Sequence, residues 1–424
     1  MEKQLIKTQL HGWHLYHGAK MVEFHNYEMP LWYSTGAKKE HISVIRSAGL
    51  FDTSHMAILV IYGIDSFDFL QHCFTRDLNH CIEKEKVAIK PYNCIYGAFL
   101  NDHGEVIDDA IVYYLQKNSF MIVLNSGMAD RITRHLNLYR KSKNVKIIDI
   151  AHYIGKIDLQ GHESARILMK VLDKSCPLDE NLKYHEFRGD FDKSFKLTDT
   201  MHLIDGIPIL FSRTGYTGEF GFEIFVHQSD LLKVWEKILN AGQDYGLIPC
   251  GLAARDSLRV GALLPLSTQD IGDGTFDNNP WTFILPYNSN SATFSKKFVG
   301  HNALLNKTNT NYTYPFVGYD LRKVSIDDPA LVIDSYGNVI GKALTCVSDM
   351  SIGRSNNRIF CISSSDRPEN FKPEGLSCGF IKVNSKYTPG QIVEIKDNRR
   401  RIKVMIVDDI RPDRSAHHSI RDMM

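Results

Sequence analysis

Apolar positions recur with two different periods along the first three hundred residues. Apolar side chains at every third or fourth position are typical of amphipathic helices, and alternation or short apolar runs are typical of strands. Strands and helices that mix with antiparallel hairpins indicate an α+β fold rather than a doubly wound parallel sheet. The pattern predicts helices over 39–49, 65–74 and 129–142, strands over 56–63, 93–100, 105–115 and 120–126, and strand, turn and helix over both 156–172 and 222–241.

The pattern changes after about residue 310. Short apolar strands separated by Gly, Asn-Arg or Asp-Asn turns replace the helical periodicity, which predicts a small all-β domain, a barrel or a sandwich. The polar stretch 363–375 is predicted to be a loop inserted in it. A chain of 424 residues is long for a single core, so two or three domains are expected.

The composition mainly excludes classes of partner and site. The 50 Lys and Arg residues nearly cancel the 49 Asp and Glu residues, so no global field indicates nucleic acid or a membrane as partner. The basic run 398–401 is predicted to be a solvated hairpin tip. The eight cysteines have no disulfide or zinc-site spacing, so free thiols and no metal site are expected. The first residues lack an apolar secretory core, so we expect a cytoplasmic setting.

The three middle strands place polar side chains on one face. A four-residue turn after the first strand sets Tyr96 opposite Asp109, and the following turn sets Asn125 opposite Asp109 as well. Because a carboxylate flanked by a phenol and an amide is unusual in a core, these residues are candidates for a site, although a solvent-facing Asp109 remains the alternative. Asp108 should point to the other face, which excludes an acid and base pair sharing one site. The same face continues with Ile111 and Tyr113.

A second candidate carboxylate is Glu223, in the strand that follows the glycine-rich stretch "SRTGYTGEFG". Alternation puts it on the face opposite to Phe222 and Ile224, so if both faces are covered it is buried and needs a partner. A carboxylate accepts two parallel N–H bonds from a planar donor pair, which a pterin or guanine ring offers. The alternative is a salt bridge to Arg213 or Arg255.

Seven motifs occur along the chain: "SRTGYTGEFGFEI", "GAKMVEFHNYEMPLWY", "AGLFDTSHM", "GEVIDDAIVYY", "LQGHESA", "CGLAARDSLRV" and "TQDI". Together they resemble the glycine-cleavage T-protein family, the folate-dependent aminomethyltransferases. The resemblance covers roughly residues 10–300 and implies a three-domain cloverleaf with tetrahydrofolate in its central hole. It implies a discontinuous first domain (1–58 with 150–228), a second (59–149 with 229–300) and a C-terminal all-β domain (310–424).

The resemblance also implies roles for individual residues. Asp109 would lie beside the reactive folate nitrogen, and Glu223 would grip the pterin. The resemblance implies transfer of the carbon of an aminomethyl group, carried on a lipoylated protein, to folate with loss of ammonia. Further positions assigned to the folate pocket are Met56, Tyr96, Ile111, Tyr113, Asn125, Tyr216 and Arg255.

The chain departs from the family pattern around the substrate side. Gly261 stands where the family usually has an acidic residue, and 278–288, 347–357 and 408–419 are also unusual. Two other functions therefore stay open: a demethylase that passes methyl groups from a small O-, N- or S-methylated substrate to tetrahydrofolate, and a non-catalytic folate-binding regulator. The retained Asp pair argues against the regulator. Candidates for the substrate side of the pocket are Gln269, Trp281 and Tyr287.

Overall fold

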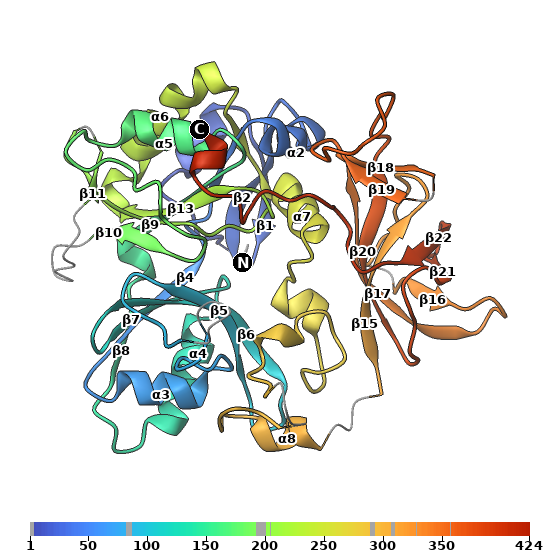
Figure 1. Cartoon of the computed structure of the whole chain (residues 1–424), viewed down its shortest axis with the longest axis horizontal. Coiled ribbons are helices and arrows are strands. Elements are labelled where there is room, and N and C mark those ends of the chain that lie inside the picture. The colour runs from blue at the N-terminus through green and yellow to red at the C-terminus, as the bar shows by residue number, and fades with distance from the viewer. Residues whose placement is uncertain are drawn as a thin grey trace.

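Within the part of the chain that the structure describes, the strands form two open sheets, one closed barrel and two small hairpins. The computed structural model describes residues 4–424 except 82–86, 192–200, 204, 289–292, 307–309, 328 and 357. Figure 1 shows three lobes, one for each open sheet and one for the barrel, with α7 (Leu252–Gly261) between the barrel and the other two. The predicted α+β fold with a C-terminal all-β domain is confirmed.

The first lobe is built on a seven-stranded sheet. Its order is β10-β12-β13-β9-β3-β14, with β11 beside β12. On β13, Phe222 and Ile224 pack under α5 and α6 in a fully buried cluster, as alternation predicts. β14, which the predicted boundaries give to the second domain, pairs in parallel with β3. The elements are β3 (Gly49–Asp52), β9 (Ile154–Gln160), β10 (Phe187–Gly189), β11 (Met201–His202), β12 (Pro208–Ser212), β13 (Gly221–His227), β14 (Ile248–Cys250), α5 (Ser164–Val171) and α6 (Leu231–Gly242).

The second lobe is a five-stranded antiparallel sheet of order β5-β6-β7-β4-β8. The predicted register of β6 with β7 is confirmed, since Ala110 pairs with Leu124. The predicted register of β5 with β6 is wrong by two residues: Leu100 pairs with Val106 and not with Glu105, and an irregularity between Phe99 and Leu100 adds the second residue, which sets Tyr96 opposite Ile111. The elements are β4 (Ala57–Tyr62), β5 (Cys94–Leu100), β6 (Val106–Gln116), β7 (Ser119–Leu124), β8 (Lys146–Asp149), α3 (Ser66–Cys73) and α4 (Ala129–Arg140).

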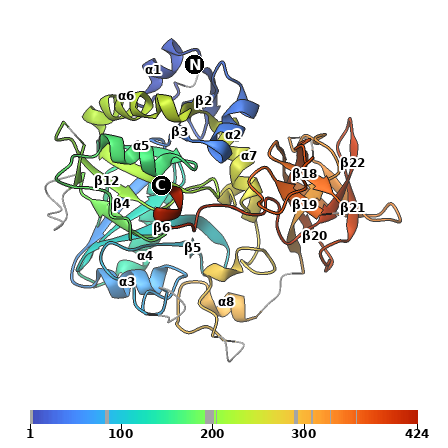
Figure 2. The same cartoon turned by 45° about the horizontal axis from the view of Figure 1, so that its top comes forward.

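The third lobe is a closed barrel of order β15-β20-β17-β16-β21-β22. The predicted loop 363–375 contains no helix or strand, and residues 398–400 form the turn between β21 and β22. After the barrel, the chain returns to the first lobe (Figures 1 and 2). The strands are β15 (Tyr312–Gly318), β16 (Leu331–Ile333), β17 (Val339–Asp349), β20 (Leu376–Val383), β21 (Ile392–Lys396) and β22 (Arg401–Ile406), with a hairpin of β18 (Ile352–Ser355) and β19 (Arg358–Cys361).

The remaining elements frame the lobes. All eight cysteines are free thiols, and among the described residues none of the helices is long and apolar enough to cross a membrane. The N-terminal hairpin packs beside α2 and α7. These elements are α1 (His11–Tyr16), β1 (Lys20–Phe24), β2 (Tyr27–Trp32), α2 (Ala37–Arg46) and α8 (His301–Leu305).

Candidate functional site

A cavity of about 1390 Å³ lies where the three lobes meet. The N-terminal hairpin, the β5–β7 meander, α7 and the glycine-rich loop, which we define as residues 213–220, all contribute to its wall. The barrel adds Lys323 and Met350, and the end of the chain adds His417. The cavity therefore depends on the relative position of all three lobes.

Asp109 is on the wall of this cavity and is 9% exposed. The Tyr96 hydroxyl donates to Asp109 Oδ2 at 2.8 Å, and Asn125 Nδ2 donates to Asp109 Oδ1 at 2.7 Å. The predicted row of three polar residues is thus assembled, because a register error of two residues leaves every side chain on the same face. The alternative of a solvent-facing Asp109 is wrong.

Asp108 faces away from the cavity but shares an amide with Asp109. Asn125 Nδ2 donates to Asp108 Oδ1 at 2.7 Å, and the Asn125 backbone N–H donates to Asp108 Oδ2 at 3.0 Å. Burial, followed by the charge of Asp109, raises the pKa of Asp108 well above its ordinary value. Burial also raises the pKa of Asp109, but hydrogen bonds from Tyr96 and Asn125 oppose that rise. Asp109 is therefore the first of the two to ionise.

The partner of Glu223 is a buried lysine from the neighbouring strand. Lys156 Nζ lies 2.5 Å from Glu223 Oε1 and 2.6 Å from Asp158 Oδ1, and Lys156 is 1% exposed. The Thr214 hydroxyl donates to Glu223 Oε2 at 2.5 Å, and the Tyr113 hydroxyl donates to the same oxygen at 3.3 Å. Glu223 is on the cavity wall, and Lys156 lies behind it.

Neither arginine that the sequence offers as a partner contacts Glu223. Arg255 Nη1 pairs with Asp158 Oδ2 at 2.8 Å, and its guanidinium lies 4.7 Å from the ring centre of Tyr216. Arg213 Nη1 donates to the Gly221 carbonyl at 2.7 Å. Two cations and two carboxylates, Lys156, Arg255, Asp158 and Glu223, thus form one buried, charge-balanced cluster under the cavity.

The other predicted residues divide into those on the cavity wall and those away from it. Trp281 does not reach the wall, since it is 2% exposed and its indole N–H donates to the Leu263 carbonyl at 2.7 Å. Tyr287 lies outside as well, 42% exposed and packed against Phe294. The same segment contributes Phe283 instead. Tyr113 lies behind Glu223. The predicted residues on the wall are Met56, Tyr96, Asp109, Ile111, Asn125, Tyr216, Glu223, Arg255 and Gln269.

Sequence reasoning missed three residues at or behind the cavity wall. Lys156 and Asp158 alternate with apolar residues in a strand that is buried throughout, and this spacing places both on one face. That signal was available in the sequence. His55 also lines the cavity; burial, with Arg255 nearby, lowers its pKa to about 3, so its ring is neutral. His55 Nδ1 has no hydrogen-bond partner within the described residues.

Comparisons with known proteins assign the chain to a family. The GCVT N-terminal domain model matches residues 10–277. An aminomethyltransferase of Clostridium botulinum is 32% identical over 348 residues, which cover 81% of this chain and 85% of that protein. One of Bacillus cytotoxicus is 34% identical over 267 residues, 63% of this chain and 66% of that protein. The crystal structure of glycine cleavage system aminomethyltransferase T from Bartonella henselae shares the fold with a TM-score of 0.75, at 24% identity over 95% of this chain and 97% of that one. The chain belongs to the GCVT family, the glycine-cleavage T-proteins.

Proposed function

We propose that the protein is an aminomethyltransferase that binds tetrahydrofolate in the central cavity. The carbon donor in this proposal is an aminomethyl group on the lipoyl arm of a carrier protein. The observation that carries the proposal is the pair of carboxylates on one cavity wall: Asp109, held by Tyr96 and Asn125, and Glu223, held by Lys156. The family membership of the chain, whose relatives are named aminomethyltransferases, supports it.

The cavity suits two reactants better than one. Typical small-molecule sites enclose about 300–1,000 Å³, and this cavity encloses about 1390 Å³. A ligand of the size of tetrahydrofolate therefore leaves room for the end of a donor arm. The reducing, cytoplasmic setting that we propose agrees with eight free thiols.

Glu223 retains acceptor capacity for a heterocyclic N–H fork. A carboxylate offers about four lone-pair positions. Lys156 occupies one lone-pair position on Oε1, so one position on that oxygen stays open. On Oε2, a ligand would have to displace only the 3.3 Å contact from Tyr113, whose hydroxyl also has Ser212 as a partner at 3.0 Å. Because Lys156 already neutralises Glu223, a neutral donor such as a pterin suits this position better than a cation would.

In the proposed reaction, tetrahydrofolate supplies the nitrogen that accepts the carbon unit. Asp109 contributes a fixed negative charge beside a developing cation and can hold an N–H of the acceptor in place. Tyr96 and Asn125 fix the orientation of Asp109, so its charge needs no rearrangement during the reaction.

The test is to identify the folate product. The protein is incubated with tetrahydrofolate and aminomethylated carrier protein, and separately with a panel of small O-, N- and S-methylated donors. Methylene-tetrahydrofolate with release of ammonia supports the proposal. Methyl-tetrahydrofolate from a methylated donor would replace it with the demethylase alternative, and binding without turnover of any donor would replace it with a regulatory role.

A further inference from the structure

The end of the chain forms a bridge between two lobes. We define the C-terminal segment as residues 407–424, which follow β22 and run from the barrel to the first lobe (Figures 1 and 2). Its last residues are anchored there, since Ile420 and Met423 belong to the core of the seven-stranded sheet. The Arg166 guanidinium donates to the Met424 carbonyl at 3.0 Å. The segment is therefore part of the fold and not a loose tail.

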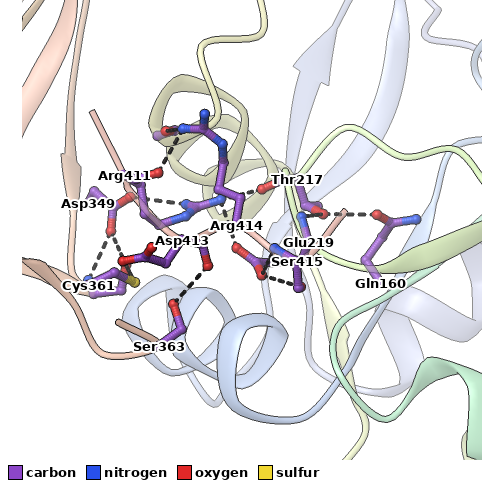
Figure 3. Close-up of polar contacts among 12 residues, drawn as sticks. Gln160, Thr217, Glu219, Asp349, Cys361, Ser363, Arg411, Asp413, Arg414 and Ser415 are labelled. Carbon is purple, nitrogen blue, oxygen red and sulfur yellow. Dashed lines mark hydrogen bonds and ion pairs between the residues drawn. The ribbon is translucent and has the colours of Figure 1, made fainter. Parts of the chain in front are cut away.

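A buried arginine in this segment contacts both lobes. Arg411 is 0% exposed; its Nη1 lies 3.0 Å from Asp349 Oδ2, at the end of β17, and its Nη2 lies 3.2 Å from Glu219 Oε1, in the glycine-rich loop. Its Nη2 also donates to the Thr217 carbonyl (Figure 3). His41 Nε2, from α2, is 2.9 Å from the other Asp349 oxygen. One guanidinium thus joins the barrel to the glycine-rich loop.

The same segment satisfies the backbone of the glycine-rich loop. The Ala416 N–H donates to the Gly218 carbonyl at 3.1 Å, and the Phe220 N–H donates to the Ser415 hydroxyl at 3.0 Å. Arg213 Nη2 donates to the Ala416 carbonyl at 3.0 Å. The loop is therefore held largely by groups outside its own sequence. Without the segment, these buried polar groups would lose their partners.

Gly261 makes room for the Arg411 contact. A Cβ atom at this position would lie 2.4 Å from Asp349 Oδ2 and 2.6 Å from Arg411 Nη1, closer than any real contact. Any side chain at 261 would therefore push the two charged groups apart. Gly261 and the stretches 347–357 and 408–419, which the resemblance leads us to expect to depart from the family pattern, meet at this single contact.

We propose that Arg411 is a positioning residue for the site and acts through the glycine-rich loop. The loop places Thr214, Gly215 and Tyr216 on the cavity wall, and the segment itself adds His417. Arg411 fixes the loop against Asp349, so the wall has its binding shape only while the barrel and the first lobe are docked. The effect on ligand affinity rests on the proposed function; the effect on the loop does not.

The experiment compares Arg411→Met with Arg421→Met, a control in the same segment whose side chain is 64% exposed. Hydrogen exchange of the peptide 213–220 and the affinity for tetrahydrofolate are measured on the full chain. We expect at least tenfold faster exchange of the loop and at least tenfold weaker binding for Arg411→Met, with Arg421→Met like the wild type. Unchanged exchange in a folded Arg411→Met protein overturns the proposal.

Two further variants separate positioning from folding. Gly261→Ala keeps every charged group but displaces Arg411 from Asp349, so it should lower the melting temperature less than Arg411→Met does, while loop exchange rises by a similar factor. Arg411→Lys keeps the positive charge but loses the two-pronged guanidinium. Relative to Arg411→Met, it should restore the melting temperature more than it restores the protection of the loop from hydrogen exchange. If loop exchange and melting change in strict proportion across all variants, the role is structural only and the proposal fails. If the wild type does not bind tetrahydrofolate, the proposed function fails, while loop exchange still tests Arg411.

Discussion

Replacing Lys156 with methionine keeps most of the side-chain volume and removes only the ammonium group. In the wild type this group has three acceptors, Asp158 at 2.6 Å, Glu223 at 2.5 Å and Thr53 at 3.2 Å, and is 1% exposed. Of the two carboxylates, Arg255 contacts only Asp158, so Glu223 would then be a buried carboxylate without a contacting cation among the described residues. Removing one partner of a buried ion pair costs about 3–5 kcal/mol, because an uncompensated charge remains.

The assay is thermal and urea unfolding, with Lys170→Met as the matched control. Lys170 is 43% exposed and lies 3.7 Å from Asp244, so its loss should cost under about 1 kcal/mol. We expect a much larger loss for Lys156→Met, at roughly 2–4 °C of melting temperature per kcal/mol. Because Glu223 also loses its fixed orientation, affinity for tetrahydrofolate should fall. Equal melting of the two variants would refute the reasoning.

The pH dependence of this loss has a defined sign. Burial acts to raise the pKa of Asp158, but Lys156 and Arg255 more than compensate and hold it below its ordinary value. A carboxyl group with a lowered pKa stabilises the fold above its unfolded value, about 3.9, and this contribution is lost as the pH falls. The deficit of Lys156→Met should therefore be largest above about pH 5 and shrink under acid conditions.

Three other substitutions have defined expectations. Asp109→Asn should lower turnover about 10²–10³-fold with tetrahydrofolate affinity nearly unchanged. Because burial raises the pKa of Asp109, ionisation of this carboxyl group opposes folding as the pH rises, so the variant should have a higher melting temperature than the wild type at neutral pH. Glu223→Ala should weaken tetrahydrofolate binding by about 1.5–3 kcal/mol, and equal affinity in calorimetry would contradict its assigned role. Burial lowers the pKa of Lys296 to about 7, so wild-type stability should rise with pH from about 7 towards 10, and Lys296→Met should flatten that rise in urea titrations.

The alternation of side chains along single strands predicted much of the site. The pairing of Ala110 with Leu124 was predicted correctly, although Gln116 and not Leu115 pairs with Ser119 and an irregularity after Tyr114 restores the predicted register. Alternation put Tyr96 on the face of Asp109 even though the pairing of β5 was off by two residues. Side-chain direction has a period of two, so an even error does no harm, whereas an odd one would have moved Tyr96 to the other face.

Contacts between residues far apart in the sequence could not be predicted in this way. Glu223 meets Lys156 only because β13 pairs with β9, and 67 residues separate the two side chains in the chain. Nothing local sets that register. Trp281 and Tyr287 were misplaced for a different reason: their segment has no regular period, so the direction of each side chain is unknown until the backbone is known. The Arg411 contact joins three segments and has no periodic signal at all.

The cavity wall is shared among three lobes, and this has a thermodynamic consequence. A ligand that contacts all three binds only when every lobe is folded and docked, so its binding free energy stabilises them together by RT ln(1 + [L]/Kd). Lobes that unfold at separate temperatures without ligand should converge on one transition at saturation. The ligand would then act as a structural cross-link, and calorimetry would report the number of cooperative units rather than affinity alone.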